Sequence, residues 1–315
     1  KNMKNKMNVH LYEKSYHKSH FLKEVSKKLN LNTKVFQKNI FECENELNLR
    51  VINEFDNLVT ILRRYQINVH VLIDKDKPKK PDSIFPNNIF ISMEKNKFIY
   101  SSMKCLNRRY ERKNDITGFL KKNGFNIKYI NDYSVYENRN KFLEGTGSLV
   151  LDRTNKLAFC ALSPRSDKEL LQIFCDEYSF EPVIFTAYQN HNNRRALIYH
   201  TNVVMSICSD YSIVCFDAID SFKEKNNVYK KLKEAGKTII EINEDQLLSF
   251  AGNVIELKNI DNESFIVMSS RALNSLNNNQ KKMICKFSKI ISSDISTIED
   301  VGGGGIRCMI AEIFN

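Results

Sequence analysis

The sequence contains no tryptophan, only five prolines and ten glycines, and no hydrophobic run of the length that a membrane span requires. A membrane-crossing helix needs about 20 consecutive apolar residues, so a membrane-spanning protein is excluded. Collagen-like and low-complexity chains are excluded as well, because they are rich in glycine or proline. The chain has 315 residues, 42% of them hydrophobic and 27% charged. This composition is that of a globular protein with one large domain or two small ones.

Arginine is missing from the first 34 residues, which hold nine lysines and only two acids, Glu13 and Glu24. This segment carries +7 of the total net charge of +11, so the rest of the chain carries only +4. Nucleic-acid-binding faces usually gather arginine and lysine over a folded surface. We therefore expect residues 1–30 to be a basic extension, and we expect neither a nucleic-acid nor a membrane partner.

The eight cysteines include no Cys-x-x-Cys pair, and most of them lie in apolar stretches. This pattern is typical of reduced, buried thiols in a cytoplasmic protein. His17 and His20 lie in the lysine-rich segment, without carboxylate or cysteine ligands at a metal-binding spacing. We therefore expect no metal ion and no cofactor.

A unit of two strands, a helix and a third strand recurs four times along the chain. The hairpins open near residues 89, 148, 203 and 254, at spacings of 59, 55 and 51 residues. The helices are expected at residues 51–65, 108–120, 167–178, 228–235 and 279–290. A repeat of this size indicates a closed or stacked repeat architecture. Met309–Phe314 would give the first strand of a fifth unit and Val51–Ile73 its helix and last strand, so that both termini would close the ring.

The loops that enter the first strands carry the reactive residues. They hold Asp82, Glu144, His200 and Cys308, the last after four consecutive glycines at 302–305. Taken singly, such a cysteine or histidine is more often a core residue. Equivalent loops of a closed repeat meet at one end of its axis, however, so we expect these side chains to converge. A thiol, a histidine that moves protons and a carboxylate that orients the histidine are what covalent cysteine catalysis needs.

Several motifs make the chain recognisable as a member of a known group. They are PDSIFPNNIF (81–90), NRRYER (107–112), EGTGSLVLDR (144–153), LSPRS (162–166), YHTNVVMSI (199–207), GNVIEL (252–257) and GGGGIRCMIAEIF (302–314). With these motifs the chain resembles the pentein superfamily of guanidine-modifying enzymes, which includes arginine deiminase, dimethylarginine dimethylaminohydrolase and the amidinotransferases. It is most similar to the amidinotransferase-like subgroup that contains citrulline-utilisation hydrolases. The resemblance implies one catalytic domain over residues 31–315, an α/β fold with five ββαβ blades arranged as a propeller.

The resemblance also implies roles for individual residues. Cys308 is similar to the family's nucleophile, His200 to its acid/base, and Glu144 to the carboxylate that assists the histidine. Asp82 is similar to the carboxylate that grips the head group of the substrate, and Arg109 and Arg165 to arginines that hold the substrate's carboxylate.

The sequence departs from the family pattern at three asparagines. Asn87, Asn88 and Asn202 stand where guanidine-specific members often carry acids. We therefore expect a cysteine-dependent hydrolase that cleaves a C–N bond of a ureido or guanidino amino acid through a covalent cysteine intermediate, with the neutral citrulline favoured. An amidinotransferase, an arginine deiminase-type enzyme and an inactive pentein that serves as a binding module remain as alternatives, and a homo-oligomer remains open.

Overall fold

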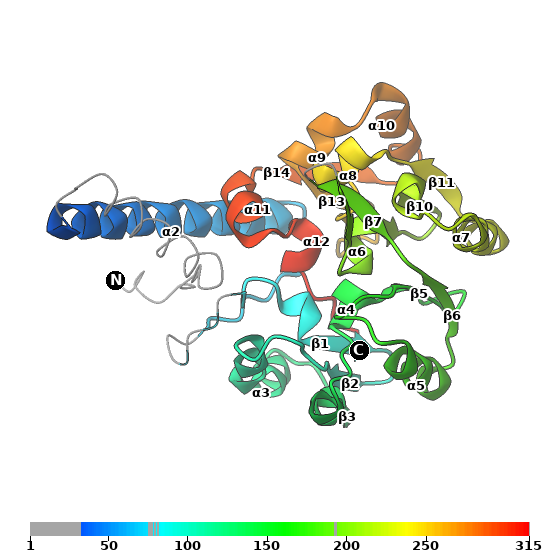
Figure 1. The fold of residues 1–315 in the computed structure, drawn as a ribbon, viewed down its shortest axis with the longest axis horizontal. Coiled ribbons are helices and arrows are strands. Elements are labelled where there is room, and N and C mark those ends of the chain that lie inside the picture. The colour runs from blue at the N-terminus through cyan, green and yellow to red at the C-terminus, as the bar shows by residue number, and fades with distance from the viewer. Residues whose placement is uncertain (1–32, 75–77, 79, 81, 192–193, 315) are drawn as a thin grey trace.

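The computed structural model describes residues 33–74, 78, 80, 82–191 and 194–314 (Figure 1). The predicted basic extension, residues 1–30, lies outside these residues, as do His17 and His20. The fold is α/β and contains four separate three-stranded sheets of mixed direction, together with a two-stranded hairpin. The helices in the described part of the chain include none with the length and hydropathy of a membrane span.

Each three-stranded sheet repeats one topology. The first strands are β1 (Phe90–Met93), β4 (Val150–Asp152), β9 (Met205–Ile207) and β12 (Ile255–Lys258). The middle strands, antiparallel to the first, are β2 (Lys97–Tyr100), β5 (Leu157–Ala161), β10 (Tyr211–Val214) and β13 (Ser264–Ser269). The third strands, parallel to the middle ones, are β3 (Tyr129–Asp132), β6 (Glu181–Phe185), β11 (Thr238–Glu241) and β14 (Lys289–Ser293). The four predicted repeats are therefore confirmed.

A helical segment joins the two parallel strands of each sheet, because a parallel connection needs a long crossover. These segments are α3 (Ile116–Lys122), α5 (Lys168–Tyr178), α7 (Phe222–Glu234) and the pair α9 (Ser270–Ser275) and α10 (Asn278–Ile284). The side chains of Asp115, Asp167, Ser221 and Asn277 accept a backbone N–H in the first turn of α3, α5, α7 and α10. In Figure 1 α3, α5, α7 and α10 lie at the periphery of the molecule.

The remaining elements are short, with the exception of α2 (Thr33–Arg64). The α-helices are α4 (Gly145–Ser148), α6 (Thr201–Val204), α8 (Glu244–Leu248), α11 (Ser296–Gly302) and α12 (Ile306–Met309). The 3₁₀ helices are η1 (Pro86–Asn88), η2 (Arg108–Lys113), η3 (Tyr133–Arg139) and η4 (Phe216–Ala218), and the extra hairpin is β7 (Tyr188–His191) with β8 (Arg194–Leu197).

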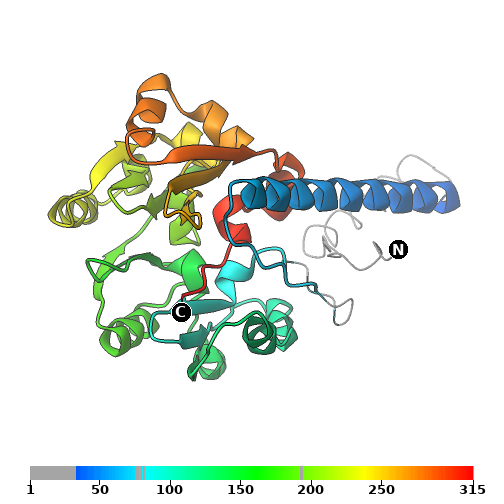
Figure 2. The same cartoon turned by 180° about the vertical axis from the view of Figure 1, so that it is seen from behind.

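Several predicted boundaries were wrong. The helix expected at 108–120 is divided into η2 and α3, because Asp115 caps a new helix. The helix expected at 279–290 ends at Ile284, and the chain then enters β14, where Ile291 is buried in the sheet's core. The helix expected at 51–65 is the C-terminal part of α2, which packs on α11 and β14 through Val51, Leu58 and Leu62. Figures 1 and 2 show the N-terminal part of α2 projecting from the body of the molecule.

The predicted fifth unit is present only in part. The structure assigns no strand to the described residues 67–74 or 310–314, and Met309, the expected start of a strand, is the last residue of α12. The C-terminal segment runs to β1, where the Phe314 N–H donates to Ser92 Oγ at 2.9 Å. A cavity of about 880 Å³ is lined by both extended segments, including Val69, Val71, Ala311 and Ile313. Neither segment belongs to a sheet among the described residues, so the structure shows four three-stranded sheets and no fifth one in this part of the chain.

Candidate active site

A row of short turns forms the framework of the site. Helix η1, α4 and α6 directly precede β1, β4 and β9, the turn at residues 250–253 precedes β12, and α12 precedes the C-terminal segment. Helix α4 contacts both η1 and α6, and α12 contacts η1. These contacts bring together the loops that the sequence analysis singled out, in the middle of the molecule (Figure 1).

The turns approach each other closely because glycine lies at their contacts. A Cβ on Gly147 would stand 2.5 Å from Asn88 Oδ1 and 2.9 Å from His200 Nδ1. A Cβ on Gly305 would stand 2.8 Å from Asn253 Oδ1. These distances are shorter than van der Waals contact, so a larger residue would push the polar side chains of the site apart.

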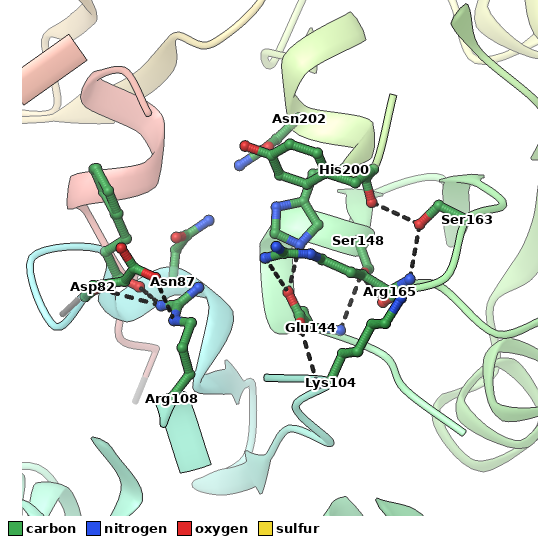
Figure 3. Close-up of polar contacts among 12 residues, drawn as sticks. Asp82, Asn87, Lys104, Arg108, Glu144, Ser148, Ser163, Arg165, His200 and Asn202 are labelled. Atoms are coloured by element: carbon green, nitrogen blue, oxygen red, sulfur yellow. Dashed lines mark hydrogen bonds and ion pairs between the residues drawn. The ribbon is translucent and has the colours of Figure 1, made fainter. Parts of the chain in front are cut away.

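Glu144 and His200, to which the resemblance gave the roles of assisting carboxylate and acid/base, form a buried pair. The distance between His200 Nε2 and Glu144 Oε2 is 2.8 Å, and both side chains are almost fully buried (Figure 3). Glu144 Oε1 accepts the backbone N–H of Lys104 at 3.0 Å, and Arg165 Nη1 donates to Oε2 at 3.4 Å. An ionised carboxylate only accepts, so Nε2 carries the proton and Nδ1 keeps its lone pair.

The charges of this pair follow from its surroundings. Burial favours a raised pKa for Glu144, but the hydrogen bond from His200 and the positive charges of Arg165 and Arg108 outweigh it and lower the pKa to about 2. Burial also lowers the pKa of His200, and this effect exceeds the opposing effect of Glu144. At neutral pH the pair is therefore a carboxylate beside a neutral imidazole, which is the form that can take up a proton.

The thiol of Cys308 lies among amide donors. Asn253 Nδ2 is 3.3 Å and Asn202 Nδ2 3.6 Å from Cys308 Sγ, and the Cys308 N–H donates to Asn253 Oδ1 at 3.4 Å. Burial raises the pKa of Cys308, and the hydrogen bonds from the two asparagines and the charge of Arg307 oppose the shift without cancelling it. The group is thus a thiol at neutral pH until a base removes its proton.

Asn253 was not among the predicted site residues. Its place in the sequence is nevertheless a signal, because it stands in the loop before the fourth first strand, as His200 and Glu144 stand before theirs.

Asp82 faces the site together with an arginine that the sequence analysis did not select. Asp82 Oδ2 is 3.7 Å from Arg108 Nε, and Figure 3 shows both across from Glu144 and His200, with Asn87 nearby. Arg108 is buried, and Glu111 holds it with two hydrogen bonds of 2.9 and 3.0 Å. It also donates to the backbone carbonyls of Asp82 and Phe85. Arg108 therefore fixes the loop that presents Asp82.

The structure does not bring Arg109 to this cluster. The Nε of Arg109 donates to the Met103 carbonyl at 2.9 Å and lies 3.1 Å from Glu137 Oε2. These partners hold the guanidinium against Glu137, so the expected contact with a substrate carboxylate has no support at Arg109. Arg165, in contrast, lies beside Glu144, as described above.

Three buried asparagines present unsatisfied polar atoms. Asn87, Asn88 and Asn202 are each at most 3% exposed. Both side-chain polar atoms of Asn87 and the Oδ1 atoms of Asn88 and Asn202 have no hydrogen-bond partner in the part of the chain that the structure describes. Buried polar groups are normally paired, and leaving one unpaired destabilises the fold by about 1–3 kcal/mol. Unpaired amides beside a thiol and a histidine are therefore expected where a polar ligand binds.

No group of three or more histidine, cysteine, aspartate or glutamate residues that could hold a metal ion occurs among the described residues. The polar cluster of the site consists of the Cys308 thiol, the His200–Glu144 pair, the arginines Arg108 and Arg165, and the asparagine amides described above. This set of groups can carry out nucleophilic attack and proton transfer.

The family model for "N,N dimethylarginine dimethylhydrolase, eukaryotic" matches residues 25–315. The chain belongs to this family. The family is part of the pentein superfamily that the motifs indicated, so the resemblance is confirmed. The dimethylarginine dimethylhydrolase family consists of hydrolases that act on guanidino or amidino C–N bonds.

Solved structures share the fold at low sequence identity. The apo structure of ArgZ, an arginine dihydrolase from the ornithine-ammonia cycle in cyanobacteria, has a TM-score of 0.65 and 16% identity, covering 84% of this chain and 38% of that chain. The complex of an AgrE mutant with L-arginine has a TM-score of 0.64 and 17% identity, covering 83% of this chain and 35% of that chain. A dimethylarginine dimethylaminohydrolase adduct with 4-chloro-2-hydroxymethylpyridine has a TM-score of 0.58 and 13% identity, covering 83% of this chain and 90% of that chain.

One curated relative matches a short stretch only. Over 44 residues the chain is 66% identical to the ribosomal RNA small subunit methyltransferase G of Pelagibacter ubique (strain HTCC1062). The matched stretch covers 14% of this chain and 21% of that protein. The chain thus spans about a fifth of that relative and little more than a third of ArgZ. A match of this extent assigns no activity to the chain.

Proposed function

We propose that this protein is a cysteine-dependent hydrolase that cleaves a C–N bond of a ureido or guanidino amino acid, with citrulline favoured over arginine. The buried Glu144–His200 pair carries the proposal, because it supplies an oriented, neutral imidazole. His200 stands two residues before Asn202, whose Nδ2 lies 3.6 Å from the buried Cys308 Sγ. The family match to dimethylarginine hydrolases supports the same class of reaction.

In the proposed reaction the proton of Cys308 passes to His200, and the thiolate sulfur bonds to the ureido carbon. The bond from this carbon to its terminal nitrogen breaks, and the proton from His200 goes to the leaving ammonia. Water then gives a proton to His200 and adds to the carbon. The carbon–sulfur bond breaks, the proton on His200 returns to the Cys308 sulfur, and the released carbamic acid decomposes to ornithine and carbon dioxide. Glu144 remains ionised throughout and stabilises the imidazolium that forms twice in the cycle.

The preference for a neutral head group rests on the three asparagines. Enclosing a guanidinium without charge partners is unfavourable by several kcal/mol. The unpaired Oδ1 atoms of Asn87, Asn88 and Asn202 can accept a ureido N–H, and the unpaired Nδ2 of Asn87 can donate to the ureido oxygen. Asp82 and Glu144 remain to accept further N–H groups. Loss of the attraction of about one ion pair would favour the neutral ureido substrate over the guanidinium substrate by about ten- to a hundredfold.

We also propose an architecture with a fifth blade. We assign α2 and the extended segments at 67–73 and 310–314 to a fifth blade, so that the molecule is a five-bladed propeller with the site at its axis. The packing of Leu72 in one apolar cluster with Ala311 and Ile313 supports this assignment. A cytoplasmic location agrees with the cysteines, because no disulfide bond joins those whose side chains the structure describes.

The test is kcat/KM for L-citrulline and for L-arginine at the same pH, with ammonia, ornithine and citrulline measured as products. We expect the value for citrulline to be about tenfold higher or more. A higher value for arginine would contradict the amide argument and indicate a deiminase. Turnover of neither substrate, with the folded protein still binding both, would indicate a binding module.

A further inference from the structure

Tyr199 directly precedes His200 and contacts two residues of the site. Its ring lies edge-on to the imidazole of His200, with 4.8 Å between the ring centroids. The guanidinium carbon of Arg165 lies 4.7 Å from the centroid of the same ring. Tyr199 is 41% exposed, so the ring stands at the surface of the site while both of its contacts lie deeper.

The backbones of these residues are tied together. Ser163 Oγ donates to the Tyr199 carbonyl at 2.7 Å, and the Arg165 N–H donates to Ser163 Oγ at 3.0 Å (Figure 3). On the other side of the turn, the Arg165 carbonyl accepts from Ser148 Oγ at 2.8 Å. The turn that carries Arg165 is therefore anchored both to the loop of Tyr199 and to α4.

The guanidinium of Arg165 has N–H groups that remain available for a further hydrogen-bond acceptor. A guanidinium has five N–H donors in a fixed plane. Within the described residues, the hydrogen bond to Glu144 is the one that its guanidinium makes, and the side chain is 25% exposed. One edge thus faces Glu144, one face lies on the Tyr199 ring, and the remaining N–H groups are able to take a carboxylate in a two-point contact.

We infer that Tyr199 is a positioning and specificity residue, whose ring fixes the plane of Arg165 so that Arg165 binds the carboxylate of an α-amino acid substrate. The inference rests on the proposed function, whose amino-acid substrate carries that carboxylate, and adds Tyr199 to the residues that make a decarboxylated analogue disfavoured. The ring provides a flat face for the cation, and the phenol hydroxyl is not needed for this role.

The experiment compares Tyr199→Leu and Tyr199→Phe with the full-length wild type, using L-citrulline and its decarboxylated analogue N-carbamoylputrescine. We expect Tyr199→Leu to raise KM for citrulline roughly tenfold, with kcat changed less than about threefold. KM for the analogue should stay the same, and Tyr199→Phe should restore the wild-type KM for citrulline. If Tyr199→Leu does not fold, Tyr199→Gln, which also removes the ring but keeps a polar side chain at this exposed position, takes its place with the same expected result.

The matched control is Tyr229→Leu, since Tyr229 is also an exposed tyrosine beside a cation, Lys233, but lies on α7 at the periphery. This variant should leave both kinetic constants unchanged. A fall in kcat at unchanged KM in Tyr199→Leu would overturn the inference, because it would show that Tyr199 acts through His200. An equal rise of KM for both substrates, or a Phe variant as impaired as the Leu variant, would also overturn it. If the wild type turns over neither compound, the proposed function fails first, and that result is separate from any effect of Tyr199.

Discussion

Burial controls the chemistry of single residues in this site. It lowers the pKa of His200 and raises that of Cys308, so that the imidazole is neutral and the thiol protonated at neutral pH. An ion pair of thiolate and imidazolium is therefore not the resting form. The proton must leave Cys308 when the substrate is bound.

This resting form predicts the pH dependence of alkylation at Cys308. A raised pKa means that the thiolate fraction is small at pH 7 and increases with pH, so the alkylation rate should rise about tenfold per pH unit between pH 7 and 9. The measurement is iodoacetamide labelling followed by peptide mass spectrometry. Urea-unfolded protein is the control, and there the same peptide should label faster at each pH. A rate in the folded protein that is already constant between pH 7 and 9 would contradict the account.

At the scale of residues, the sequence could not show which of two neighbouring arginines faces the site. Arg108 and Arg109 have the same chemistry, and the motif NRRYER does not tell which of them faces the site. The choice is made by η2, a 3₁₀ helix with three residues per turn, which places Arg108 over Glu111. Asn253 was equally hard to select, since an asparagine after a glycine in a turn needs no function.

At the scale of elements, turns of three or four residues carry the site. Glycines at their contacts allow this, because Gly147 and Gly305 each lie directly against a polar side chain of a neighbouring turn. The glycine-containing loops were visible in the sequence. The polar hairpin β7–β8 was not, since its strands lack apolar alternation and Arg195 ties it to Asp220 and Glu244 through ion pairs.

Gly147→Ala tests the close contact of α4 with α6. The added Cβ would displace His200 or Asn88, and misplacement of a catalytic group by about 1 Å lowers kcat/KM by about a hundredfold. We expect a loss of that order in kcat/KM, with a smaller effect on stability. The control is Gly236→Ala at the end of α7, where the positive φ of 73° disfavours alanine but no atom lies within 4 Å. This control should lose about 1 kcal/mol of stability and keep kcat/KM. Equal losses of kcat/KM in both variants would contradict the argument.

At the scale of the molecule, the repeat was predictable because each unit has two apolar strands before its helix. The fifth unit was predicted from the termini, and the structure provides its helix and two extended segments without a ladder between them. A fifth sheet would need a strand that pairs with both segments. The hydrophobic pattern of the sequence does not identify such a strand.

Removing residues 1–30 tests the domain boundary. We expect the truncated protein to keep its Tm within about 2 °C of the full chain, and its kcat/KM, because the four sheets and the polar cluster lie within residues 82–314. Thermal unfolding and citrulline turnover of the two proteins give the answer. A truncated chain that fails to fold would show that these residues belong to the core, for example as a strand of the fifth unit.

The central claim is that Cys308 forms a covalent bond with the substrate carbon. The most direct measurement is mass spectrometry of the acid-quenched protein after mixing with L-citrulline, L-arginine, methylarginines or agmatine, with Cys308→Ser as the matched variant. The account predicts an adduct on the Cys308 peptide and release of ammonia with the preferred substrate, and neither in the folded Ser variant, because an alcohol is a much weaker nucleophile than a thiolate. Turnover that persists in Cys308→Ser, or an adduct on another residue, would contradict it.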